Sequence, residues 1–100
     1  MDTAAQQKVD LTPIWITLYF DPAMQMVVGK PVMRSMVSKG CPFWFVLRNL
    51  LSDYPEIWRR HPPGTLGFTL NGVAPALETL LADGDRIAFF VNQHAKSLPS

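Results

Sequence analysis

One helical stripe in the middle of the chain constrains the fold most strongly. Between residues 42 and 58 the apolar side chains recur at about 100° per residue, which places them on one face of a helix. The stripe consists of Phe43, Val46, Leu47, Leu50, Leu51, Tyr54, Ile57 and Trp58. Pro42 favours a helix start, because the N–H that proline lacks is not needed at the first helical position. Pro55 disfavours helix at the residue before it, so we expect the helix to end near residues 52–54 and a separate turn to follow.

Segments on both sides of this helix have the apolar alternation of β-strands. The alternation predicts strands at residues 14–20 and 32–37 before the helix, and at residues 65–70 and 86–91 after it. Residues 23–31 fit either a short helical turn or an extended loop. Asn71-Gly72 is a strong hairpin signal, residues 75–77 fit a short strand, and residues 78–81 fit one helical turn. Strands packed on one face by a helix predict a two-layer α+β domain.

Composition indicates a single domain that folds without a disulfide or a structural metal ion. The chain has 100 residues, of which 48% are hydrophobic, so it can bury a core unaided. Cys41 is the only cysteine, which excludes an internal disulfide and fits a reducing compartment. The net charge of +1 argues against a general nucleic-acid binder. No signal peptide or membrane-spanning run is seen, so we expect a cytoplasmic protein with no membrane partner.

We expect three parts along the chain. Residues 1–10 are polar and form a disordered N-terminal tail, residues 11–92 form the domain, and residues 93–100 form a polar C-terminal tail.

Several segments together resemble a known family. They are the first strand ITLYF, the loop ending in VGK, the Tyr54-Pro55-Glu56 turn and the stretch LNGVAPALETLLADGDRIAFF. In their order and content they resemble the ubiquitin-like β-grasp proteins, and more narrowly the sulfur carriers: the small subunit of molybdopterin synthase and the thiamine-pathway carrier. The resemblance implies a mixed β-sheet of four to five strands packed on one main helix. It also implies sulfur chemistry on a C-terminal Gly-Gly. No Gly-Gly pair occurs in this chain, so we do not assign the sulfur transfer of that family to it.

Cys41 is the one candidate nucleophile. It lies at the predicted helix N-terminus, where the helix dipole and free N–H groups can lower the pKa of a thiol. No histidine lies within a few residues to act as its base, so a small structural residue is the favoured interpretation and a reactive thiol the alternative. His61 and His94 are far apart, which predicts no metal site. His61 is expected to cap the end of the helical segment. We expect no cofactor and no enzymatic activity.

Four large aromatic residues at outward positions indicate a partner surface. They are Trp15, Tyr19, Trp44 and Phe45. Loops could cover these rings, or the rings could contact a protein partner or a second copy of the chain. We favour the pair on the first strand, on the expectation that this is an edge strand with unpaired backbone groups.

The sequence therefore predicts a non-enzymatic β-grasp module that docks its sheet face on itself or on a larger protein. Two alternatives stay open. One is a sulfur-carrier-like or thiol-dependent accessory protein in cofactor biosynthesis. The other is a small RNA-binding β-grasp domain, although no aromatic–basic RNA motif is present.

Overall fold

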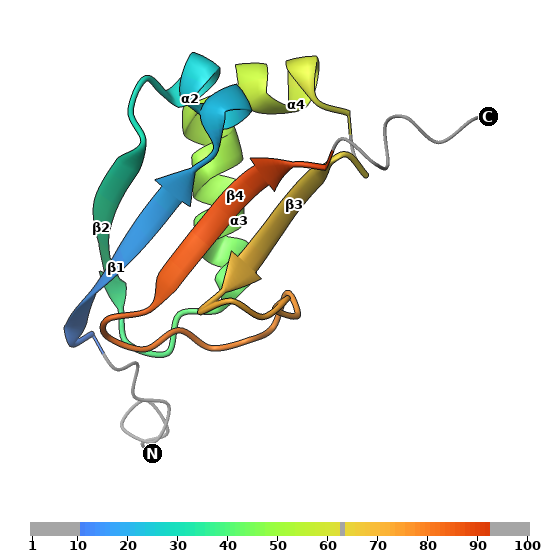
Figure 1. The fold of residues 1–100 in the computed structure, drawn as a ribbon. Coiled ribbons are helices and arrows are strands. Elements are labelled where there is room, and N and C mark those ends of the chain that lie inside the picture. Colours follow the sequence, from blue (N-terminus) through green and yellow to red (C-terminus); the bar gives the residue numbers. More distant parts are fainter. Residues whose placement is uncertain (1–10, 63, 93–100) are drawn as a thin grey trace.

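The computed structural model describes residues 11–62 and 64–92, which form two layers (Figure 1). The elements in chain order are β1 (Pro13–Phe20), α2 (Pro22–Val28), β2 (Val32–Ser38), α3 (Phe43–Asp53), α4 (Glu56–Arg60), β3 (Leu66–Leu70) and β4 (Arg86–Val91). The four strands form one sheet in the order β2-β1-β4-β3. β1 and β4 run parallel, and the other two pairs are antiparallel. The predicted mixed sheet with one main helix is confirmed, and the two predicted tails lie outside the described residues.

The core lies between the sheet and α3, which crosses one face of the sheet (Figure 1). β1 and β4 alternate between buried and less buried residues, as period-2 strands with one covered face should. The buried side chains of α3 are Phe43, Val46 and Leu50. The ring of Phe43 lies 4.9 Å from that of Phe68 and 6.5 Å from that of Phe89, measured between centroids. The aromatic rings thus join the start of α3 to β3 and β4.

Residues 22–28 form a helix, one of the two alternatives that the sequence left open. Asp21 caps its N-terminus, because Oδ1 of Asp21 accepts a hydrogen bond of 2.8 Å from the N–H of Met24. Gly29 ends the helix at φ = 90°, a backbone conformation that glycine adopts without steric cost. The second oxygen of Asp21 accepts a bond of 2.9 Å from the N–H of Val91, so this one carboxylate ties α2 to the end of β4.

Two expectations for residues 71–85 are wrong. Residues 75–77 form no strand, and residues 78–81 form no helical turn. The Asn71-Gly72 turn has positive φ at both residues and closes only one bridge, between Leu70 and Val73. The chain then runs past the start of α3, where the carbonyls of Thr79 and Leu77 accept bonds from the N–H groups of Phe43 and Trp44. This loop is therefore irregular because its backbone caps α3 instead of pairing with a strand.

Two expectations about neighbouring elements are also wrong. β1 is an interior strand, and the edges of the sheet are β2 and β3, because β4 inserts beside β1 in parallel. Trp58 does not continue the buried stripe of α3 and is 51% exposed. Proline cannot continue a helix, so α3 ends before Pro55 and α4 is a separate helix after it. Residues of α4 therefore do not follow the stripe of α3: Ile57 is buried, whereas Trp58 faces outward.

Candidate functional site

The sheet face opposite α3 has no described element in front of it (Figure 1). The pairing register aligns the outward side chains of the four strands in rows. Trp15 lies opposite Met36, and Tyr19 lies between Val32 and Ala88. We call this surface the outer sheet face. It consists of Trp15, Thr17, Tyr19, Val32, Arg34, Met36, Gly67, Thr69, Arg86, Ala88 and Phe90.

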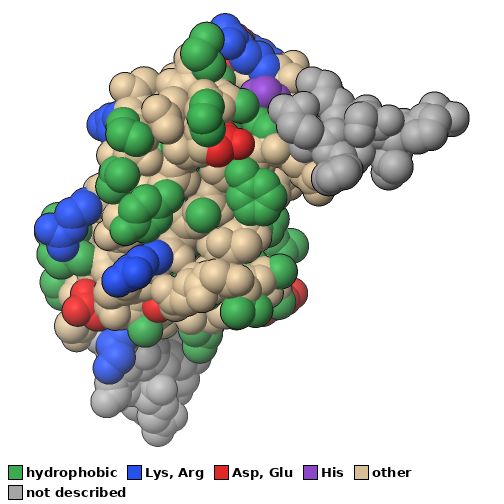
Figure 2. Space-filling view, viewed as in Figure 1, with side chains coloured by type: hydrophobic (Ala, Val, Ile, Leu, Met, Phe, Trp, Pro, Cys, Tyr) green, Lys and Arg blue, Asp and Glu red, His purple; other side chains and the backbone are tan. Residues whose placement is uncertain are grey.

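The outer sheet face is apolar and cationic. Trp15 is 44% exposed, Tyr19 39% and Met36 56%. None of the four described strands contains Asp or Glu, whereas Arg34 and Arg86 both lie on this face. Hydrophobic and basic side chains occupy its middle in Figure 2. An exposed apolar surface of this kind on a small domain is typical of a contact site, and its charge favours an acidic partner.

Two local contacts shape the ends of this face. The guanidinium carbon of Arg34 lies 4.6 Å from the centroid of the Trp15 ring, a cation–π geometry that fixes both side chains. At the other edge the ring of Phe90 lies directly on the backbone of Gly67, where any Cβ would collide with it. Glycine at position 67 thus lets an aromatic ring lie flat across the edge strand β3.

The four aromatic residues predicted as partner contacts fall into two separate pairs. Trp15 and Tyr19 lie on the outer sheet face, while Trp44 and Phe45 lie on α3, in the other layer. On α3 the Arg48 guanidinium carbon lies 5.1 Å from the Trp44 ring centroid and 5.4 Å from that of Phe45. The structure therefore does not bring the two pairs together.

Sequence reasoning did not place the other residues of this surface around the first pair. Val32, Arg34 and Met36 on β2 lie beside β1, and Arg86 on β4 lies opposite Thr17. The alternation of residues 32–37 and 86–91 did indicate that each strand has one buried and one exposed face. Their exposure could not be assigned without knowing which strand faces α3 and which strands are neighbours.

Cys41 lies just before α3, with its Sγ 3.5 Å from the carbonyl oxygen of Pro42. Burial raises the pKa of the Cys41 thiol, opposite to the lowering that a helix N-terminus can produce. In addition, the N–H groups of Phe43 and Trp44 at the start of α3 already donate hydrogen bonds to the carbonyls of Thr79 and Leu77. These two N–H groups are therefore already paired and are not available to stabilise a thiolate at position 41.

We expect this raised pKa to be visible in alkylation kinetics. Only the thiolate reacts with iodoacetamide, so the midpoint of the rate against pH should be higher for the folded chain than for the chain in denaturant. Accessibility changes the maximal rate but not this midpoint. The folded state binds the proton of the Cys41 thiol more tightly than the unfolded state does, so this proton stabilises the fold. Its contribution to the free energy of unfolding is complete below the unfolded pKa and is lost as pH rises through the folded pKa. A midpoint below that of the unfolded chain would show an activated thiol.

His61 is the C-cap residue of α4, at the end of the helical segment where the sequence led us to expect it. His61 ends α4 and its backbone N–H bonds to the carbonyl of Ile57, while His94 lies outside the described residues. Residues 11–62 and 64–92 contain no cluster of three His, Cys, Asp or Glu side chains that could hold a metal ion. Within the same residues no helix is long and apolar enough to cross a membrane.

Comparison with known proteins identifies the fold. The small archaeal modifier protein 1 of Haloferax volcanii superimposes with a TM-score of 0.66 at 23% identity, covering 78% of this chain and 97% of that one. A putative molybdopterin converting factor subunit 1 of Pyrococcus furiosus gives a TM-score of 0.67 at 13% identity, with coverages of 78% and 97%. The ubiquitin of Caldiarchaeum subterraneum gives 0.55 at 18%, with coverages of 80% and 94%. No family model and no curated protein sequence matches the chain.

These likenesses establish a ubiquitin-like β-grasp fold, which confirms the fold that the resemblance in the sequence implied.

Proposed function

We propose that this protein is a non-enzymatic interaction module that docks on a protein partner through its outer sheet face. The observation that carries the proposal is the face itself: large, exposed apolar side chains with two arginines and no carboxylate on any described strand. Trp15, Tyr19 and Met36 would supply the buried contacts at such an interface, since aromatic residues dominate binding energies. The archaeal modifier and the converting-factor subunit are neighbours in fold and support a role as a small partner of a larger protein.

The charge of the outer sheet face favours a foreign partner over a second copy. A symmetric dimer brings the same patch of both copies together. Arg34 and Arg86 of each copy would then face an arginine-bearing surface without any strand carboxylate to pair with. Like charges across a contact oppose association, so the homodimer that the sequence left open is disfavoured on this face.

Photo-cross-linking in cells that produce the chain tests this function. A benzophenone amino acid at Met36 should give one discrete protein adduct, whereas the same probe at Trp58 on α4 should not. Trp58 is the matched control because it is an exposed aromatic on another element. Mass spectrometry of the adduct separates a foreign protein from a second copy. Adducts of equal yield at both positions, or no adduct at Met36, would contradict docking through this face.

Substitution of the two aromatic residues on β1 tests their contribution to the affinity for the partner. We expect the Trp15→Ser/Tyr19→Ser variant to bind the cross-linked partner at least about 30-fold more weakly, because the loss of even one hot-spot ring costs about 2 kcal/mol or more. The Trp44→Ser/Phe45→Ser variant is the control from the other layer and should keep its affinity. Analytical ultracentrifugation of the unaltered chain should show a monomer. Loss of binding in the α3 variant alone would move the interface to α3.

A carrier role is the second candidate, favoured by the likeness to a molybdopterin converting factor subunit. Sulfur transfer of that kind needs a flexible glycine terminus, and the sequence contains no two consecutive glycines. Mass spectrometry of the protein purified from its native cells decides the matter. A C-terminal thiocarboxylate would establish the carrier role, and an unmodified terminus would leave docking as the function.

A further inference from the structure

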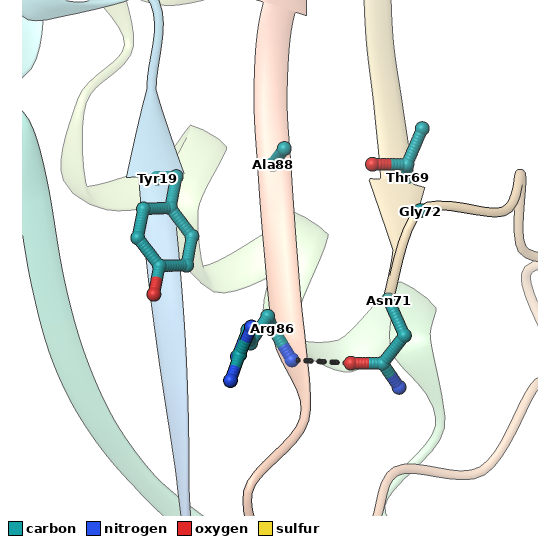
Figure 3. Close-up of a pocket in the computed structure, with 6 residues that line it drawn as sticks. All are labelled: Tyr19, Thr69, Asn71, Gly72, Arg86 and Ala88. Atoms are coloured by element: carbon teal, nitrogen blue, oxygen red, sulfur yellow. Dashed lines mark hydrogen bonds between the residues drawn. The ribbon is translucent and has the colours of Figure 1, made fainter.

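A pocket on the outer sheet face lies where β1, β4 and the end of β3 meet (Figure 3). Its volume is about 550 Å³, and the residues that line it are Tyr19, Thr69, Asn71, Gly72, Arg86 and Ala88. Pockets of roughly 300–1,000 Å³ hold small ligands or parts of them. This one is therefore large enough to receive a side chain of a docked protein.

The pocket is rich in hydrogen-bond donors that have no partner among residues 11–62 and 64–92. They are the Arg86 guanidinium, the hydroxyls of Tyr19 and Thr69, and the N–H of Gly72. The main potential acceptor, Oδ1 of Asn71, already accepts a bond of 2.9 Å from the Arg86 backbone N–H (Figure 3). Donors in excess of acceptors favour an anionic ligand.

The carboxylate of Asp85, the residue before Arg86, has hydrogen-bond partners of its own. Oδ1 of Asp85 accepts a bond of 2.9 Å from Nδ2 of Asn71, and its Oδ2 accepts one of 2.7 Å from the N–H of Ala82. Asp85 does not line the pocket. Both of its oxygens accept hydrogen bonds from groups other than the Arg86 guanidinium, so the positive charge of Arg86 stays available to a ligand.

We infer that this pocket binds a carboxylate side chain of the protein partner, an inference that rests on the docking function proposed above. The Arg86 guanidinium pairs with the carboxylate, and the Tyr19 hydroxyl and the Gly72 N–H add hydrogen bonds. The Tyr19 ring and Ala88 contact apolar groups beside the acid. In Figure 3 the side chains of Tyr19 and Arg86 come from neighbouring strands and border the same space.

Two other occupants fit the site less well. A second copy of the chain offers no strand carboxylate from its own outer sheet face. Nucleic acid gains affinity by neutralising many phosphates in succession, whereas Arg34 and Arg86 are the only cations on this face and Arg34 is stacked on Trp15. A single carboxylate on an otherwise apolar partner surface matches one free guanidinium among aromatic and aliphatic neighbours.

Nuclear magnetic resonance titration with two peptides tests the site. The probes are acetyl-Leu-Glu-Leu-amide and its counterpart with Gln in place of Glu. We expect the Glu peptide to shift the amide signals of Gly72 and Ala88 and to bind about tenfold more tightly, since a charge-assisted hydrogen bond replaces a neutral one. Arg86→Gln should remove this preference without lowering the melting temperature, because the side chain is exposed. Arg48→Gln on α3 is the matched control and should keep the preference.

Equal affinity for the two peptides overturns the carboxylate site, as does a preference that survives Arg86→Gln. Absence of any shift at the pocket overturns it too. A short oligouridylate that shifts the same signals at lower concentration than the Glu peptide would replace the carboxylate by a phosphate ligand. These results are independent of the photo-cross-linking test, so an adduct at Met36 together with equal peptide affinities would retain the docking function and remove only this site.

Discussion

Replacing Phe43 by Ala should lower the free energy of unfolding by about 3–5 kcal/mol. Phe43 is completely buried and its ring packs against those of Phe68 and Phe89, so its removal leaves a cavity that the surrounding sheet can fill only in part. Single domains of this size have total stabilities of about 5–15 kcal/mol, so the loss is a large share. Urea unfolding followed by circular dichroism measures it directly, and the midpoint should fall with an unchanged slope.

Phe45→Ala is the matched control on the same helix. Phe45 is only partly buried and lies under the guanidinium of Arg48, so its loss should cost about 1 kcal/mol, part of the transfer energy of a buried ring. The contrast between the two phenylalanines reports which face of α3 contacts the sheet. Similar losses for both substitutions would show that the orientation of the helix is wrong.

Replacing Asp21 by Ala should lower the free energy of unfolding by about 2–4 kcal/mol, because one carboxylate serves two elements. Its Oδ1 caps α2 through the Met24 N–H, and its Oδ2 accepts the N–H of Val91 at the end of β4. Alanine removes the cap and leaves the Val91 donor without its acceptor. Chemical denaturation gives the size of the loss, and hydrogen exchange at Met24 and Val91 shows where it arises.

Asp21→Asn separates the two contributions. Asparagine is as good a helix cap as aspartate, but its amide has a single acceptor oxygen and cannot serve both N–H groups. We expect about half the loss seen with alanine, with faster exchange at Val91 and little change at Met24. An asparagine variant as stable as the unaltered protein would show that the bond to Val91 contributes nothing.

Periodicity alone determined the main elements of this protein. The alternation around Ile16 and Phe89 and the helical stripe through Leu50 are local patterns, and each predicts its element because one face must be buried. The order of these elements, with the stretch from Leu70 to Phe90, was sufficient to indicate a β-grasp fold. The absence of consecutive glycines was equally plain in the sequence.

Only the tertiary structure decided what surrounds each element. The insertion of β4 beside β1 made β1 an interior strand and placed Arg86 in the same pocket as Tyr19, although the two residues are distant in sequence. The carbonyls of residues 77 and 79 accept hydrogen bonds from the start of α3, and the chain there forms neither the predicted strand nor the predicted helical turn. Long-range hydrogen bonds of this kind produce no periodic pattern in the sequence. They depend on which backbone N–H and C=O groups remain unpaired once the elements have packed together.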